Sequence, residues 1–196
     1  MVGVIPTPAI AYLTRTHHMD AGVMISASHN PFEYNGIKFF DGFGYKLPDE
    51  TEDKIEECML KDERAALQSR PTGAAIGTIS AWTDLQQEYA DFICKSTDID
   101  LSGLKVVHDG ANGSASVLGP EILKRLGAEV IAIHHEPNGV NINEKCGSTH
   151  LESLKETVLK YGADVALPMT VTLTAAWLST KRARKWMATR SCSSAP

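Results

Sequence analysis

The stretch SASHNP, residues 26–31, places two hydroxyls, one imidazole and one amide close together in the chain. It follows the apolar residues 23–25, which read as a short buried strand, and it precedes the apolar residues 37–40. This pattern predicts a polar loop between two strands. Because loops carried by rigid strands often hold binding and catalytic groups, this serine loop, residues 26–31, is the first candidate site.

The residues alone leave three interpretations of Ser28 open. Ser28 and Asn30 can simply satisfy the backbone of a turn that Pro31 stiffens. Ser28 can instead be a hydrolase nucleophile, although the G-x-S-x-G elbow is absent and the adjacent His29 cannot easily turn to take its proton. In the third interpretation Ser28 carries a phosphoryl group, which would need hydrogen-bond donors and a cation around it.

The elements that must position this loop indicate an α/β chain. Apolar spacing and end signals predict helices at 9–18, 48–61, 82–95, 116–126 and 151–161. Further strands are expected at 74–79, 104–107, 128–133 and 164–167. After about residue 100, strand and helix alternate as in a parallel sheet. Gly127 and Gly162 are expected to end two of the helices in the left-handed conformation.

The composition excludes several classes of protein. The chain has 196 residues, 43% of them hydrophobic and 22% charged, which is typical of a globular protein of one or two domains. Its net charge of −5 gives no reason to expect nucleic acid or an acidic membrane as a partner. No apolar run approaches the roughly 20 residues of a membrane span. The N-terminus also lacks the pattern of a signal peptide.

The four cysteines are widely spaced, and none forms a C-x-x-C pair. Their spacing therefore does not indicate a zinc site or a redox motif. Dispersed free thiols fit a reducing cytoplasm. The cysteines are Cys58, Cys94, Cys146 and Cys192.

Longer motifs around the serine loop resemble one family. ISASHNPFEYNGIKFF, residues 25–40, resembles the phosphoserine loop of the α-D-phosphohexomutases. IPTPAIAYLTRT at 5–16 and PNGVNINEKCGSTH at 137–150 resemble the branch of that family that handles amino-sugar phosphates. DGANGSA at 109–115 resembles the glycine-rich turn that opens the family's second domain, where a cysteine is more usual at Gly110. The resemblance extends from residue 3 to about residue 167.

The resemblance implies three-layer α/β/α domains with mixed sheets, in a fragment of a four-domain enzyme. On this basis residues 1–97 are expected to be a partial first domain that carries the phosphoserine loop. Residues 98–167 are expected to be part of the second domain. Residues 168–196 are expected to be an aberrant basic tail.

The family transfers a phosphoryl group in two steps, through a phosphorylated serine and a sugar bisphosphate. The resemblance implies that Ser28 is the phosphoryl carrier and, through its phosphate, a ligand of Mg²⁺. His29 and Lys38 are expected to donate to the phosphate or sugar oxygen, or to exchange a proton with it.

The expected substrate is a sugar phosphate, with no nucleic acid or membrane as partner. The expected reaction interconverts glucosamine 6-phosphate and glucosamine 1-phosphate in the cytoplasm, for cell-wall precursor synthesis. A phosphomannomutase or phosphoglucomutase remains an alternative. A non-enzymatic product of a broken gene is another.

Residues 168–196 depart from the family pattern, because they contain no Asp or Glu and five Lys or Arg. A basic tail sometimes binds nucleic acid, but one short cluster is a weak pattern. The family places its magnesium-binding D-G-D-x-D-R motif just after the strand expected near residue 167, where this chain has PMTVT. Read one base earlier from Pro168, the underlying codons can encode D-G-D-A-D-R.

We therefore expect an out-of-frame, poorly packed tail. The family's first motif, G-T-D-G-I-R-G, does not precede Val2 either, so the first domain is expected to be truncated. A chain without these parts is expected to show no mutase turnover by itself.

Overall fold

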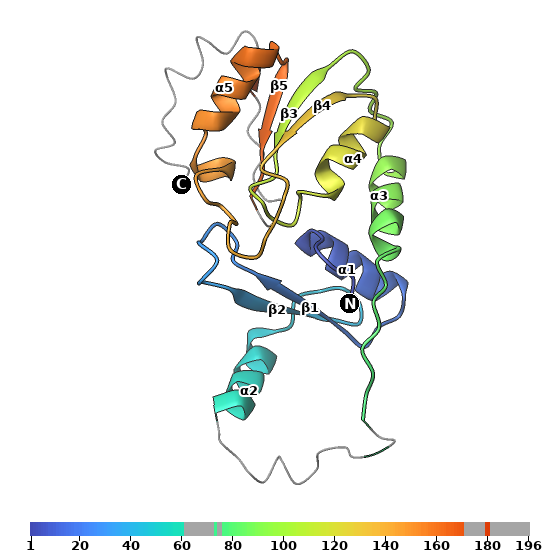
Figure 1. Ribbon diagram of the computed structural model, residues 1–196. Helices are drawn as coiled ribbons and strands as arrows, with labels where there is room; N and C mark the ends of the chain where they lie inside the picture. The colour runs from blue at the N-terminus through green and yellow to red at the C-terminus, as the bar shows by residue number, and fades with distance from the viewer. Residues whose placement is uncertain (61–72, 74–75, 171–178, 181–196) are drawn as a thin grey trace.

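The computed structural model describes residues 1–60, 73, 76–170 and 179–180 (Figure 1). The first elements are α1 (Thr7–Thr16), β1 (Ala21–Ser26), β2 (Gly36–Asp41), α2 (Asp49–Leu60) and α3 (Leu85–Lys95). The later elements are β3 (Lys105–Asp109), α4 (Leu118–Arg125), β4 (Glu129–Ile133), the 3-10 turn η3 (Gly147–Thr149), α5 (Glu152–Tyr161), β5 (Val165–Pro168) and β6 (Ser179–Thr180).

β1 and β2 form an antiparallel pair in which Met24 lies opposite Lys38 and Ser26 lies opposite Gly36. Helix α1 packs against this pair, and it can approach closely because a Cβ on Gly22 would lie 2.3 Å from Thr14 Oγ1. Burial alternates along β1, so Met24 and Ser26 are buried and the residues between them are not. The expectation of a fully buried strand at 23–25 is therefore wrong. In the described part of the chain, a helix covers one face of this pair and the other face is exposed.

The second sheet has the strand order β4-β3-β5-β6. β3 is parallel to both β4 and β5, whereas β6 is antiparallel to β5. The parallel arrangement confirms what the strand–helix alternation predicted. Helix α5 packs on the face of β3 that carries Val107, in a core cluster with Leu154, Ala163 and Ala166. Helices α4 and α5 end at the glycines that the sequence predicted, since Gly127 has φ 98° and Gly162 has φ 60°.

Helix α3 joins the two sheets into one packed body (Figure 1). A single core cluster contains Leu13 of α1, Met24 of β1, Tyr89 of α3 and Leu118 of α4. The Tyr12 and Phe92 rings stack with their centroids 4.2 Å apart. Polar contacts reinforce the packing: His17 pairs with Glu88 across α1 and α3, and Arg125 of α4 pairs with Asp91 of α3. These contacts fix the serine loop relative to the parallel sheet.

The structure differs from three expectations drawn from the sequence. Helix α3 begins at Leu85 rather than Trp82, because the residues before it form i→i−3 turn hydrogen bonds, Leu85 N–H to Trp82 O and Gln86 N–H to Thr83 O. Residues 76–79 of the strand expected at 74–79 are not a strand. Pro168 and Met169 are buried, and Met169 N–H donates to Asp109 O, so the start of the tail does not fit the expected poor packing.

The rest of that tail, apart from residue 170 and the two residues of β6, lies outside the described residues. Among the helices that the structure describes, none has the length and apolar character needed to cross a bilayer.

Candidate functional site

The serine loop lies between β1 and β2, as the sequence predicted. Ser28 is half-buried and has φ 55°, a left-handed conformation that costs a non-glycine residue roughly 1–3 kcal/mol. Local hydrogen bonds help to hold it there: Ser28 N–H donates to Ser26 Oγ (3.1 Å), and Asn30 N–H donates to Ala27 O (3.0 Å). The sequence folds this way because Ser26 ends the strand with its hydroxyl turned to the buried face.

His29 follows Ser28 directly and is exposed. Its Nδ1 lies 3.5 Å from Ser28 Oγ, which is long for a hydrogen bond from a hydroxyl. The geometry does not favour a tight Ser–His hydrolase pair. It leaves the imidazole beside the hydroxyl, at the edge of the loop.

Lys38 lies on β2 and is half-buried. Because Lys38 is opposite Met24 in the register, its side chain stands on the same face as Met24 and Ser26. It forms no ion pair with any residue that the structure describes. A half-buried ammonium without a carboxylate partner is suited to an anionic ligand. In the described part of the chain, no hydrogen bond or ion pair joins Lys38 to Ser28 or His29.

A residue that the sequence did not single out holds the loop from the other sheet. The Asn143 side-chain amide donates from Nδ2 to Ser28 O (3.1 Å) and to Asn30 O (2.8 Å). Asn143 N–H donates to Ala111 O (2.9 Å), so Asn143 ties the serine loop to the end of β3. We call this pair of side-chain hydrogen bonds the amide clamp. The only sequence signal for it was the asparagine-rich motif at 137–150.

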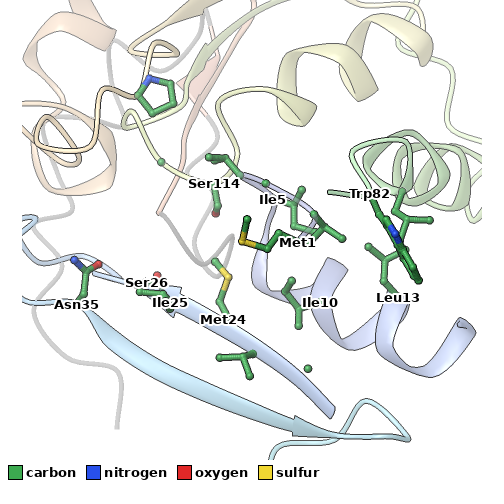
Figure 2. A pocket seen from close by; sticks show the side chains of 18 of the residues that line it. Met1, Ile5, Ile10, Leu13, Met24, Ile25, Ser26, Asn35, Trp82 and Ser114 are labelled. Carbon is green, nitrogen blue, oxygen red and sulfur yellow. The ribbon is translucent and has the colours of Figure 1, made fainter. Parts of the chain in front are cut away.

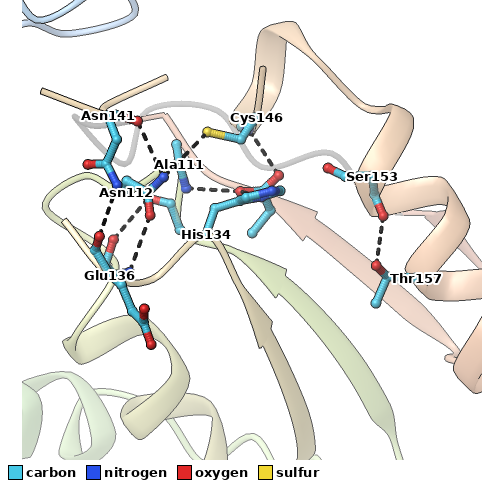
Figure 3. Close-up of polar contacts among 12 residues, drawn as sticks. Ala111, Asn112, His134, Glu136, Asn141, Cys146, Ser153 and Thr157 are labelled. Carbon is cyan, nitrogen blue, oxygen red and sulfur yellow. Dashed lines mark hydrogen bonds and ion pairs between the residues drawn. The ribbon is translucent and has the colours of Figure 1, made fainter. Parts of the chain in front are cut away.

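Side-chain amides also fold the segment that carries Asn143 (Figure 3). Asn112 accepts from Glu136 N–H (3.2 Å) and donates to Asn141 O (3.3 Å). Asn141 donates to Glu136 O (3.0 Å). These bonds hold residues 136–143 against the glycine-rich turn, residues 109–113, and so place Asn143 over the serine loop.

The glycine-rich turn uses its own N–H groups. Gly110 N–H donates to Ile133 O, Ala111 N–H to Asp109 Oδ1 and Asn112 N–H to His134 O, at 2.7–3.0 Å. Because these donors already have partners, the turn is not a cradle for phosphate. It joins the ends of β3 and β4 instead.

Three ligand-type side chains meet beside this turn. Asp109 Oδ1 lies 3.0 Å from His134 Nδ1, and the ligand atoms of Asp109, His134 and Cys146 all lie within 4.8 Å of one another. Asp109 and Cys146 are fully buried. Burial, with smaller effects from Asp109 and Glu144, raises the pKa of the Cys146 thiol to about 12. We call these three residues the Asp-His-Cys cluster.

A groove of about 1060 Å³ lies between α1, β1 and the glycine-rich turn (Figure 2). Its walls are mainly apolar, with Ile10, Leu13, Met24 and Trp82 among them, and one end reaches Ser26. Among the described residues that line it, none is Lys or Arg. The described lining thus offers no side-chain cation for a phosphorylated ligand, and we do not assign the substrate to it.

Comparison with known proteins gives the site a context. Residues 1–66 match the family described as phosphoglucomutase/phosphomannomutase, alpha/beta/alpha domain I. A phosphoglucosamine mutase from Thermoanaerobacter sp. is 54% identical over 166 residues, which is 85% of this chain and 36% of that protein. Another, from Desulforamulus reducens, is 55% identical over 85% of this chain and 37% of its own length. The chain thus spans little more than a third of these relatives.

A solved structure shares the fold. It is a phosphoglucomutase/phosphomannomutase family protein from Burkholderia thailandensis, with a TM-score of 0.63 and 24% identity over 87% of this chain and 37% of that one. The α/β architecture, the serine loop and the family match over residues 1–66 make the chain similar to proteins of the phosphohexomutase superfamily. Within that superfamily its sequence is similar to the phosphoglucosamine mutases, which is the branch that the sequence motifs predicted.

Proposed function

We propose that the chain supplies the phosphoserine part of a phosphoglucosamine mutase. The reaction interconverts glucosamine 6-phosphate and glucosamine 1-phosphate, and it serves cell-wall precursor synthesis in the cytoplasm. The observation that supports this most directly is the serine loop itself. Ser28 is half-buried between two strands, and hydrogen bonds from its own loop and from Asn143 hold it in place.

In the proposed reaction the phosphorylated Ser28 gives its phosphoryl group to one sugar hydroxyl. The bond from Ser28 Oγ to phosphorus breaks while a new bond to the sugar oxygen forms, which gives a bisphosphate. After the bisphosphate has turned over, its other phosphate returns to Ser28 Oγ. A covalent carrier divides one difficult transfer into two, and positioning with electrostatic stabilisation supplies most of the rate.

Three side chains have roles in this proposal. Lys38 balances phosphate charge from the buried face of β2, where it has no carboxylate partner among the described residues. His29 donates to, or exchanges a proton with, the phosphate or sugar oxygen beside Ser28. Asn143 is a positioning residue, because its amide binds the carbonyl of Ser28 and not the hydroxyl.

Magnesium is the metal that the family resemblance implies, and it prefers near-octahedral oxygen ligation. In the described part of the chain, the ligand-type side chains found close together are those of the Asp-His-Cys cluster, whose nitrogen and sulfur donors do not suit magnesium. The described residues around Ser28 therefore do not form a magnesium site by themselves. We assign no step of the reaction to the metal.

The whole reaction needs more than this chain is expected to provide. The D-G-D-x-D-R motif occurs nowhere in the 196 residues. We therefore expect Ser28 to accept phosphate slowly and the isolated chain to show no steady-state turnover. A phosphomannomutase or phosphoglucomutase is the alternative within the superfamily, and an inert gene product is the alternative outside it.

The test is phosphoryl transfer to the full chain from glucosamine 1,6-bisphosphate with Mg²⁺, followed by intact mass and peptide mapping. We expect one phosphate on Ser28 and none in Ser28→Ala. Label on a different residue, or no label at all, would contradict the carrier role. Conversion of glucosamine 6-phosphate within tenfold of an intact mutase, abolished by Ser28→Ala, would refute the expected inactivity. The same assay with the mannose and glucose bisphosphates distinguishes the alternative substrates.

A matched pair of variants tests the positioning role of Asn143. Asn143→Ala removes two hydrogen bonds to the loop, each worth about 0.5–1.5 kcal/mol, so labelling should slow by about 5-fold to 150-fold. Asn138→Ala is the control, because among the described residues the Asn138 side chain accepts only from the nearby Val140 N–H. Equal labelling rates for the two variants, at equal urea unfolding midpoints, would show that the amide clamp does not position Ser28.

A further inference from the structure

The Asp-His-Cys cluster stands where the topology brings separate segments together. Asp109 ends β3, and His134 follows Ile133, which lies opposite Asp109 in the parallel β3–β4 register. The carboxyl edge of a parallel sheet is a frequent place for ligands. Cys146 enters from the turn before η3 (Figure 3). Gly147 permits this approach, because a Cβ there would lie 2.7 Å from Ala111 Cβ.

The contacts inside the cluster leave one polar atom unsatisfied. The Asp109 carboxylate is held from two sides, since Oδ1 accepts from Ala111 N–H and Oδ2 from Gly147 N–H, both at 2.9 Å. His134 Nδ1 is 3.0 Å from Oδ1 yet buried without a hydrogen-bond partner in the described part of the chain. The two atoms lie at ion-pair distance but outside hydrogen-bond geometry. A cation between them would satisfy both.

We propose that Asp109, His134 and Cys146 bind one divalent transition-metal ion, and that Zn²⁺ matches the site best. An oxygen, a nitrogen and a sulfur donor together suit zinc and do not suit magnesium or calcium. The carboxylate and a metal-bound thiolate would neutralise the two charges of the ion, so the buried site would carry no net charge. Three protein ligands leave a fourth tetrahedral position for water.

The distances are compatible with this ion after a small adjustment. Tetrahedral zinc places N, O and S donors about 3.3–3.7 Å apart. In the structure the three ligand atoms lie up to 4.8 Å apart, so the longest of these distances must shorten by about 1 Å when zinc binds. Neighbouring groups already orient two of the three ligands, as the groups around a bound metal do. Two backbone N–H groups donate to the Asp109 carboxylate, and Asn112 Nδ2 lies 4.0 Å from Cys146 Sγ. Cysteine spacing did not indicate this site, because its ligands come from three separate segments.

Metal binding would tie residues 143–147 to the ends of β3 and β4. Asn143, which forms the amide clamp, lies three positions before Cys146. An ion at the cluster would therefore stabilise the segment that holds the serine loop. The metal site does not depend on the proposed phosphoryl transfer, and it is separate from the magnesium that the transfer is expected to use.

The test uses the reduced, EDTA-treated full chain, titrated with Co²⁺ alone and then with Zn²⁺. We expect one Co²⁺ per chain, a thiolate-to-cobalt charge-transfer band and tetrahedral d–d bands, all displaced by Zn²⁺. Cys146→Ser should remove the charge-transfer band and weaken binding by at least 100-fold. Cys94→Ser is the matched control and should leave both unchanged.

A second variant distinguishes the loss of a metal ligand from misfolding of the chain. His134→Asn suits the left-handed φ of 49° at this position and removes one ligand, so binding should weaken by at least 100-fold while circular dichroism stays unchanged. The proposal is overturned if the wild-type chain binds no Co²⁺, or if the band persists in Cys146→Ser. It is equally overturned if binding is lost in Cys94→Ser.

Discussion

Lowering the pH should destabilise this fold through His108, a buried histidine near the C-terminal end of β3. Its side chain is 1% exposed, and both ring nitrogens lack a hydrogen-bond partner among the described residues. Burial lowers the pKa of His108 from 6.5 to about 4, and His135 adds to this effect while the Asp109 carboxylate opposes it. The folded protein therefore binds this proton less readily than the unfolded chain does.

The sign and size follow from that difference. Above pH 6.5 the ring is neutral in both states, so His108 has no effect on the pH dependence of unfolding. As the pH falls from 6.5 to about 4, His108 binds a proton in the unfolded chain but stays neutral in the folded protein. At 1.36 kcal/mol per pKa unit, the free energy of unfolding should fall by about 3 kcal/mol over this range.

The assay is urea unfolding of the full chain at several pH values between 7.5 and 4, with EDTA present throughout. His108→Leu and His108→Gln remove the titrating ring, and other acid effects are common to all three proteins. The wild-type chain should lose about 2–4 kcal/mol more than either variant between pH 7 and pH 4. If all three lose the same amount of stability, the buried ring is not responsible.

Two further predictions concern packing and thiol reactivity. Gly119→Ala should destabilise the fold by about 1–3 kcal/mol, because a Cβ there would lie 2.3 Å from His108 Nε2. Urea unfolding measures the effect, and Gly77→Ala is the control, because a Cβ at Gly77 meets nothing within 4 Å. Equal midpoints would refute the contact. Iodoacetamide at pH 8 should modify the exposed Cys58 at least 100-fold faster than Cys146, whose pKa is raised to about 12, as peptide mass spectrometry can measure. Comparable rates in the native state would show that Cys146 is not buried as described.

Local pattern was enough to predict much of the fold. The polar loop between two apolar runs is the serine loop between β1 and β2, and the alternation of strand and helix gives the parallel strands β4, β3 and β5. Gly127 and Gly162 end their helices because glycine adopts positive φ without strain. These features depend on residues near one another in the chain, which is why the sequence shows them.

Features that depend on distant segments were not predicted. The hydrogen bond from Trp82 N–H to the Met1 carbonyl joins segments 81 residues apart, and no periodicity reports such a contact. Half of β1 is exposed because one helix covers one face, whereas an apolar run alone does not show which face is covered. The amide clamp and the Asp-His-Cys cluster also join separate segments. For Asp109 and His134 there was a usable signal, since each lies at the end of an expected neighbouring parallel strand.

The amide clamp has a consequence for synthesis of the chain on the ribosome. Asn143 is translated 115 residues after Ser28, so the loop and its clamp emerge at different times. At about 5–20 residues per second, this delay is roughly 6–23 s. During that interval Ser28 has the hydrogen bonds of its own turn but none from the second sheet. The left-handed backbone at Ser28 thus becomes fully restrained only after the second sheet has begun to fold, and translation order sets when the loop reaches its final geometry.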